Sequence, residues 1–118
     1  KKMSEDILKI KKNRNFNFAK IENLGSIKSE FTQIDQHITD ILNLDIIQID
    51  KIKKLNLKVV IDGINSVGGI AIPMLLEKLN VNYIKLNCDP TGIFSHNPEP
   101  LPQNMKDLCS SVVKNSAD

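Results

Sequence analysis

The chain has 118 residues, 41% hydrophobic and 25% charged, which suits one small globular domain but is short for a complete metabolic enzyme. A net charge of +2, with one Tyr and four Phe, provides no basic surface with aromatic side chains for stacking bases, so we expect no nucleic-acid partner. No apolar run approaches the roughly 20 residues that span a bilayer, and no apolar signal core follows Lys1 and Lys2. We therefore expect a cytoplasmic protein without a membrane partner.

The cysteine and histidine content argues against a disulfide or a zinc site. We expect Cys88 and Cys109 to stay reduced in the cytoplasm. These two cysteines, His37 and His96 lack the short spacings of zinc ligands, so no metal is expected in this chain.

Residues 1–29 are interpreted as a lead-in and linker from a preceding domain. Residues 1–12 can form a short basic helix, which would be marginal alone. An Asn-rich connector with a break at Gly25 and Ser26 follows.

Two helices are predicted next. Apolar residues recur every three or four positions over residues 30–43, which indicates a helix with one buried face: Phe31, Ile34, Ile38, Ile41 and Leu42. His37 lies beside this stripe and is interpreted as a partly exposed helix residue. A second helix is predicted over residues 45–56, with Asp50 as its N-terminal cap. Its inward-facing residues would be Ile49, Ile52 and Leu55.

A strand, helix and second strand form the centre of the chain. The apolar, β-branched run over residues 57–61 predicts a strand covered on both faces, as in a parallel sheet. A helix is predicted over residues 69–79. If Pro73 lies in the first turn of this helix, it has no hydrogen-bond partner to lose. The helix is expected to end at Asn80, because asparagine tolerates a left-handed backbone. A second strand over residues 81–87 would complete a parallel crossover. The helix is expected to face the sheet with Ile72, Leu75, Leu76 and Leu79.

The turn between the first strand and this helix has a glycine spacing close to a P-loop. Gly69 and Ile70 stand where a P-loop has Lys and a hydroxyl residue, so the groups that bind phosphate and magnesium are missing. Backbone N–H groups at a helix start can still attract an anion, which makes Gly68 and Gly69 weak candidates for an anion site. The favoured interpretation is that these two glycines let helix and sheet approach closely.

A Pro-rich segment over residues 89–102 excludes a helix or an inner strand there. Apolar residues at helical spacing then predict a final helix over residues 103–113, starting just after Pro102.

Three stretches together resemble the second domain of the α-D-phosphohexomutases, which interconvert hexose 1-phosphates and 6-phosphates. These stretches are Val59 to Gly69, Ile72 to Leu79, and Gly92 to Pro102. The last is similar to the family pattern Gly-x-Phe-Pro-His-x-Pro-x-Pro, with Ser95 in place of the first proline. The resemblance implies a three-layer α/β/α domain with a small, mostly parallel sheet over residues 30–118.

Ser95 invites interpretation as the family's phosphoserine because Ser95-His96-Asn97-Pro98 copies the sequence of that loop. Its flanks are those of the second domain, and no adjacent base or cationic clamp is identifiable, so we reject Ser95 as a nucleophile. No catalytic residue is expected in this chain.

The resemblance implies a parent phosphoglucosamine mutase, phosphomannomutase or phosphoglucomutase that uses Mg²⁺ and a phosphoserine. The four loops that carry this chemistry are not found. In the family the metal loop would follow soon after the position of Asp118, so we expect this chain to end just before that loop. The fragment would then be an inactive scaffold whose partners are the remaining domains and whose substrate, a sugar phosphate, is bound by the parent. An alternative is a non-catalytic anion-binding or protein-interaction module. An open sheet edge could also lead to association.

Overall fold

The computed structural model describes residues 2–118, and Lys1 lies outside them. The chain divides after Glu30 into two compact units, the second of which runs from Phe31 to Asp118. No helix within residues 2–118 has the length and apolar character that crossing a membrane would require.

The first unit contains one helix and a short 3₁₀ turn. Helix α1 spans Lys2–Asn13, which confirms the predicted N-terminal helix, and the 3₁₀ turn η1 spans Ile21–Asn23. The apolar side chains of α1 are exposed; Ile7 and Leu8 are 60% and 62% accessible. The rest of this unit is irregular, as its composition predicts.

The second unit begins with two helices whose lengths differ from the prediction. Helix α2 spans Gln33–Leu42, and only Ile38 of its apolar stripe is fully buried. Phe31 precedes the helix and is exposed, so its place in the buried stripe was wrong. The salt bridge from Lys78 Nζ to Asp35 Oδ1, 2.6 Å long, joins α2 to helix α4, Gly68–Lys78.

Helix α3 is shorter than predicted and spans Ile49–Lys54. Two turns of chain precede it, in which Leu44 and Ile47 donate backbone hydrogen bonds to residues three positions earlier. Gln48 therefore occupies the capping position, without a side-chain bond, and Asp50 lies inside the first turn, so the predicted Asp50 cap was wrong. Leu55, predicted to face inward, is 64% exposed.

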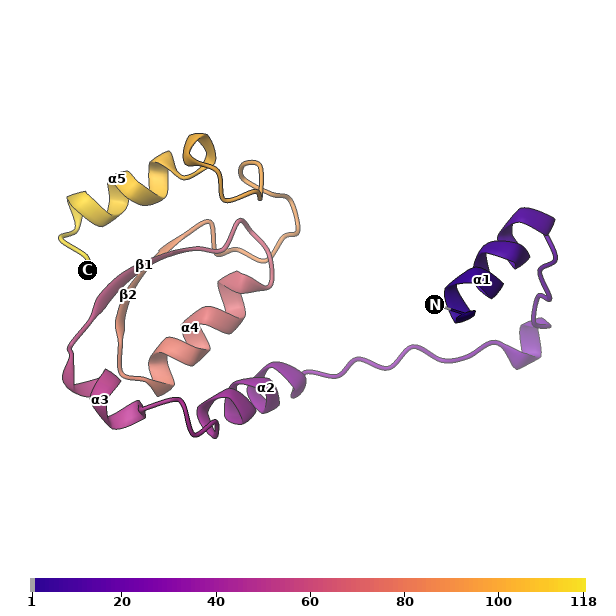
Figure 1. Cartoon of the computed structure of the whole chain (residues 1–118), viewed down its shortest axis with the longest axis horizontal. Coiled ribbons are helices and arrows are strands. Elements are labelled where there is room, and N and C mark those ends of the chain that lie inside the picture. Colours follow the sequence, from indigo (N-terminus) through magenta and orange to yellow (C-terminus); the bar gives the residue numbers. More distant parts are fainter. Residues whose placement is uncertain (1) are drawn as a thin grey trace. The chain divides into compact units, whose positions relative to one another are not determined.

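A parallel pair of strands forms the sheet, as predicted. Strand β1 spans Lys58–Asp62 and strand β2 spans Asn82–Leu86, with Lys58 opposite Asn82 and Asp62 opposite Leu86. Helix α4, Gly68–Lys78, connects them. In Figure 1, α4 and the C-terminal helix α5, Lys106–Lys114, lie on opposite sides of the strands, which gives the three-layer α/β/α arrangement.

Two details of α4 differ from the prediction. Because the helix begins at Gly68, Pro73 lies in its second turn rather than its first, where it removes the hydrogen bond that would reach the Gly69 carbonyl. Pro73 is nonetheless buried. Ile72, predicted to face the sheet, is 41% exposed. Asn80 has a φ of +52°, which confirms the left-handed residue predicted after the helix.

The close approach of helix and sheet depends on Gly63 and Gly69. A Cβ on Gly63 would lie 2.7 Å from the Cα of Gly69, and a Cβ on Gly69 would lie 2.7 Å from the backbone of Cys88. A Cβ on Gly68 would meet only the Cα of Gly63, at 4.0 Å. The prediction named Gly68 and Gly69; the structure confirms Gly69 and replaces Gly68 by Gly63.

The C-terminal helix covers the side of the sheet opposite α4. A 3₁₀ turn, η2, spans Pro102–Asn104, and α5 spans Lys106–Lys114, so the α-helix does not start just after Pro102. Lys58 Nζ donates to the Asn115 carbonyl at the end of α5. The Asp118 N–H donates to the Lys58 carbonyl, 2.8 Å away. The last described residue therefore lies beside the first residue of β1.

Candidate functional site

The candidate site lies where the two parallel strands end. β1 ends at Asp62 and β2 at Leu86, opposite each other, and the chain leaves these ends through the glycine turn and the Pro-rich segment. In open α/β sheets, ligands bind outside the carboxyl ends of the strands, so this is the edge where a site is expected.

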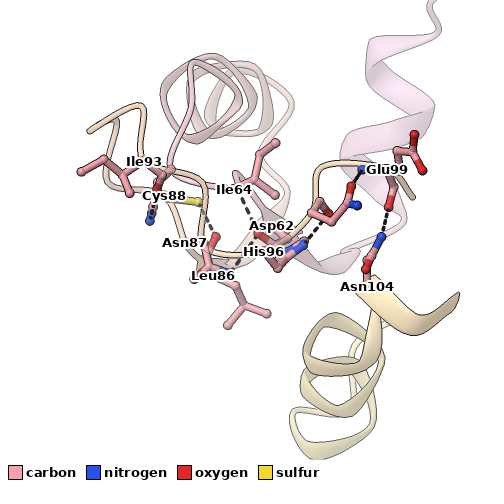
Figure 2. Close-up of polar contacts among 11 residues, drawn as sticks. Asp62, Ile64, Leu86, Asn87, Cys88, Ile93, His96, Glu99 and Asn104 are labelled. Atoms are coloured by element: carbon pink, nitrogen blue, oxygen red, sulfur yellow. Dashed lines mark hydrogen bonds and ion pairs between the residues drawn. The ribbon is translucent and has the colours of Figure 1, made fainter. Parts of the chain in front are cut away.

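Asp62 is the central polar group at this edge. Its Oδ1 accepts hydrogen bonds from the Ile64 N–H, 3.0 Å away, and from Asn87 Nδ2, 3.1 Å away. Its Oδ2 lies 2.9 Å from His96 Nε2 (Figure 2), and the Asp62 side chain is only 9% exposed. The Asp62 carboxylate thus joins the end of β1 to the glycine turn that follows it, to the residue after β2 and to the Pro-rich segment.

The three partners change the pKa of Asp62. Burial by itself raises the pKa of this carboxyl, but the hydrogen bond from His96 lowers it. The bonds from the Ile64 N–H and the Asn87 amide lower it further, so the pKa lies below its usual value. Asp62 is therefore ionised throughout the physiological range.

His96 is bound through both ring nitrogens. Nε2 faces the Asp62 carboxylate, and Nδ1 lies 2.9 Å from the Asn97 carbonyl oxygen. The hydrogen bond to Asp62 is the main cause that raises the pKa of His96; the Asn97 carbonyl adds to it and burial opposes it. The pair is thus an ion pair when His96 carries its proton.

The glycine turn holds the start of the Pro-rich segment. Asn65 donates from its backbone to the Asn87 carbonyl and from its side chain to the Ile93 carbonyl, while its own carbonyl accepts from the Gly92 N–H, 2.8 Å away. Ile64 and Asn65 have φ values of +44° and +55°. A β-branched residue rarely adopts this backbone conformation, so the bonds around the turn hold Ile64 in a strained position.

A small cavity lies between the Pro-rich segment and α5. It has a volume of about 120 Å³, and Asp62 and His96 form its polar side while Pro98, Met105 and Leu108 line the apolar side. A larger hollow of about 500 Å³ at residues 47–51 is formed by one short stretch of chain at the start of α3 and gathers no comparable polar cluster.

At the predicted anion site at the start of α4, the Gly69 and Ile70 N–H groups already have partners. The Gly69 N–H donates to the Ser66 carbonyl, 3.0 Å away, and the Ile70 N–H donates to the Val67 carbonyl. Gly69 itself is buried against Cys88. The anion-site prediction for Gly68 and Gly69 gains no support from this geometry and stays a prediction.

Ser95 is exposed in the middle of the Pro-rich segment. The neighbouring His96 directs one ring nitrogen at Asp62 and the other at Asn97, so neither nitrogen is placed to take a proton from the Ser95 hydroxyl. This agrees with the rejection of Ser95 as a nucleophile, which stays a prediction.

The described residues do not fit a magnesium ion. Within residues 2–118, no three side chains of His, Cys, Asp or Glu come together in a way that could hold a metal. The best placed carboxylate, Asp62, already accepts three hydrogen bonds, one of them from a histidine that favours its own protonated state. Both cysteines are free; Cys88 is half-buried and Cys109 exposed.

Sequence reasoning missed the Asp62–His96 pair. The two residues lie 34 positions apart, and the prediction considered His96 in its loop motif without connecting it to Asp62. A usable signal was present, because an acidic residue at the carboxyl end of a parallel strand faces whatever follows the next strand.

Comparison with known proteins identifies the family. The family described as "Phosphoglucomutase/phosphomannomutase, alpha/beta/alpha domain II" matches residues 35–118. A phosphomannomutase/phosphoglucomutase of Pseudomonas aeruginosa is 42% identical over 64 residues, which cover 52% of this chain and 14% of that protein. A phosphoglucomutase/phosphomannomutase of Thermococcus kodakarensis is 33% identical over 104 residues, which cover 87% of this chain and 22% of that protein.

A probable phosphoglucosamine mutase of Methanopyrus kandleri is 32% identical over 95 residues, which cover 80% of this chain. The chain spans between 14% and 22% of the length of these three relatives. The match over residues 35–118 covers the α/β/α unit from the third residue of α2 to the end of α5. The chain therefore belongs to the phosphoglucomutase/phosphomannomutase family, through its α/β/α domain II.

Proposed function

We propose that this chain serves as the second, non-catalytic domain of a cytoplasmic phosphohexomutase. The parent enzyme would interconvert the 1-phosphate and 6-phosphate of glucosamine, mannose or glucose through a phosphoserine. The observation that supports this most is the family match over residues 35–118, which coincides with a parallel strand-helix-strand core of the expected layer arrangement.

The role of residues 31–118 would be to support and orient neighbouring parts of the enzyme. The polar groups at the carboxyl end of the sheet are used to bond the glycine turn, β2 and the Pro-rich segment to one another, rather than being left free for a substrate. Mg²⁺ and the phosphoserine would belong to other domains, which are also the proposed partners, and the parent would bind the sugar phosphate.

A domain exchange tests this function. In the Thermococcus kodakarensis phosphoglucomutase/phosphomannomutase, the segment aligned with residues 35–118 is replaced by residues 35–118 of this chain. We expect the chimera to convert glucose 1-phosphate and mannose 1-phosphate, because a supporting domain of the same family should keep the catalytic loops in place. Product is measured in coupled assays for glucose 6-phosphate and mannose 6-phosphate.

The control is the same enzyme with the aligned segment deleted, which we expect to be inactive. A chimera that is soluble and cooperatively folded but no more active than the deletion would contradict the proposal. The 118-residue chain assayed alone should give no turnover, and turnover by this chain would contradict its non-catalytic role.

A further inference from the structure

The middle of the Pro-rich segment is held to the sheet through one polar side chain. Gly92 and Ile93 bond to Asn65 at one end of the segment, and the Glu99 carbonyl accepts from Asn104 Nδ2 at the other. Of the hydrogen bonds found for residues 94–98 within the described chain, only that of His96 to Asp62 leaves the segment.

The geometry of His96 requires a proton on both ring nitrogens. The Asn97 carbonyl and the ionised Asp62 carboxylate are both acceptors only, so a neutral imidazole, which has one N–H, can donate to just one of them. The imidazolium form satisfies both and adds a charge-assisted bond to Asp62. Figure 2 shows the His96 side chain next to Asp62.

From this arrangement we infer that His96 is a protonation-dependent latch, which in its charged form holds residues 94–98 against the carboxyl end of β1 and holds them more weakly once it is neutral and can donate only one of the two hydrogen bonds. Because His96 and Pro98 line the 120 Å³ cavity, release would open this cavity to solvent. The inference does not depend on the proposed function.

Other charged side chains also lie near His96. Asp107 on α5 favours the charged imidazole electrostatically, and Lys106 on α5 lines a neighbouring hollow with His96. Glu99, in the segment itself, lines the cavity.

The direction of the pH dependence follows from the two pKa shifts. The pKa of His96 is raised in the folded protein, so the latch is fully closed below the usual histidine pKa and opens as pH rises through the raised value. The pKa of Asp62 is lowered, so this carboxylate stays charged until the solution is strongly acidic. The latch is therefore closed in mild acid and open in mild base.

Chymotrypsin cleavage after Phe94 measures the release of the segment. The 118-residue protein is digested between pH 6 and 9, and mass spectrometry quantifies the peptide that ends at Phe94. A synthetic peptide of residues 89–102, digested at each pH, corrects for the activity of the protease. We expect the corrected cleavage rate to rise about fivefold across this range, because a partly exposed charged hydrogen bond is lost.

The substitution His96→Gln should remove this pH dependence, because glutamine does not titrate. His37→Gln is the matched control and should keep the wild-type profile. Asp62→Asn should also flatten the profile. In wild-type protein, the NMR signal of the His96 ring should titrate with a midpoint above about 6.5, and Asp62→Asn should lower that midpoint.

A corrected cleavage rate that does not change with pH in the wild-type protein would overturn the latch. So would a His96→Gln variant that keeps the wild-type pH profile, or a ring titration that Asp62→Asn leaves unmoved.

Discussion

Replacing Gly69 by alanine should lower the free energy of unfolding by about 3 kcal/mol, because the new methyl group enters a closely packed region. The Cβ would lie 2.7 Å from the Cα and the carbonyl oxygen of Cys88. Both are backbone atoms that follow β2, so they cannot move aside without displacing the strand end. Urea unfolding of the 118-residue chain, followed by circular dichroism, measures the change.

Gly68→Ala is the matched control for this experiment. A Cβ at this position has only the Gly63 Cα as a neighbour, at 4.0 Å, and alanine is the better helix former. We expect the variant to be as stable as the wild type or more stable by up to about 0.5 kcal/mol. Equal losses at both positions would contradict the packing role assigned to Gly69.

Replacing Ile38 by alanine should lower the free energy of unfolding by about 3 kcal/mol, because it leaves a cavity where a buried side chain stood. Ile38 is 2% exposed and lies on α2, which packs on α4. Ile38, Leu79 and Val81, together with Pro73 on α4, are the buried apolar side chains among the described residues. In so small a core, the loss of one member is a large share of the total stability. The same urea unfolding experiment measures the loss.

Ile46→Ala makes the same chemical change at a residue that is 80% exposed, and should alter stability by less than about 0.5 kcal/mol. If Ile38→Ala behaved like Ile46→Ala, α2 would not be part of the cooperatively folding unit.

The sequence predicted those parts of the fold that depend on local pattern. The β-branched run before Asp62 is typical of a strand, and the apolar residues of α4 and α5 recur at helical spacing. The structure contains all three elements, with ends that differ from the prediction by a few residues. The second helix was predicted too long because residues 45–48 contain no glycine or proline to mark a break. Their backbone bonds form isolated turns instead.

The features that sequence did not predict depend on how elements pack. Gly68 and Gly69 are neighbours on α4, and only the rotation of α4 about its axis decides which of them packs against Gly63 and Cys88. The Asp62–His96 pair likewise depends on where the Pro-rich segment crosses the end of β1. The positions of residues along the chain do not show which glycine packs against Cys88 or that His96 lies beside Asp62. The prediction at this edge therefore named glycines rather than the ion pair.

The parallel pairing of β1 with β2 has a consequence for the order of folding. Lys58 and Asn82 can meet only after the intervening chain has turned back, and closing that loop is entropically unfavourable until something shortens it. Helix α4 does so, and forms from local contacts. We therefore expect α4 to be partly formed in the folding transition state and the strand ladder to follow it. Substitutions on α4 should slow folding, whereas those at the far ends of the strands should mainly speed unfolding.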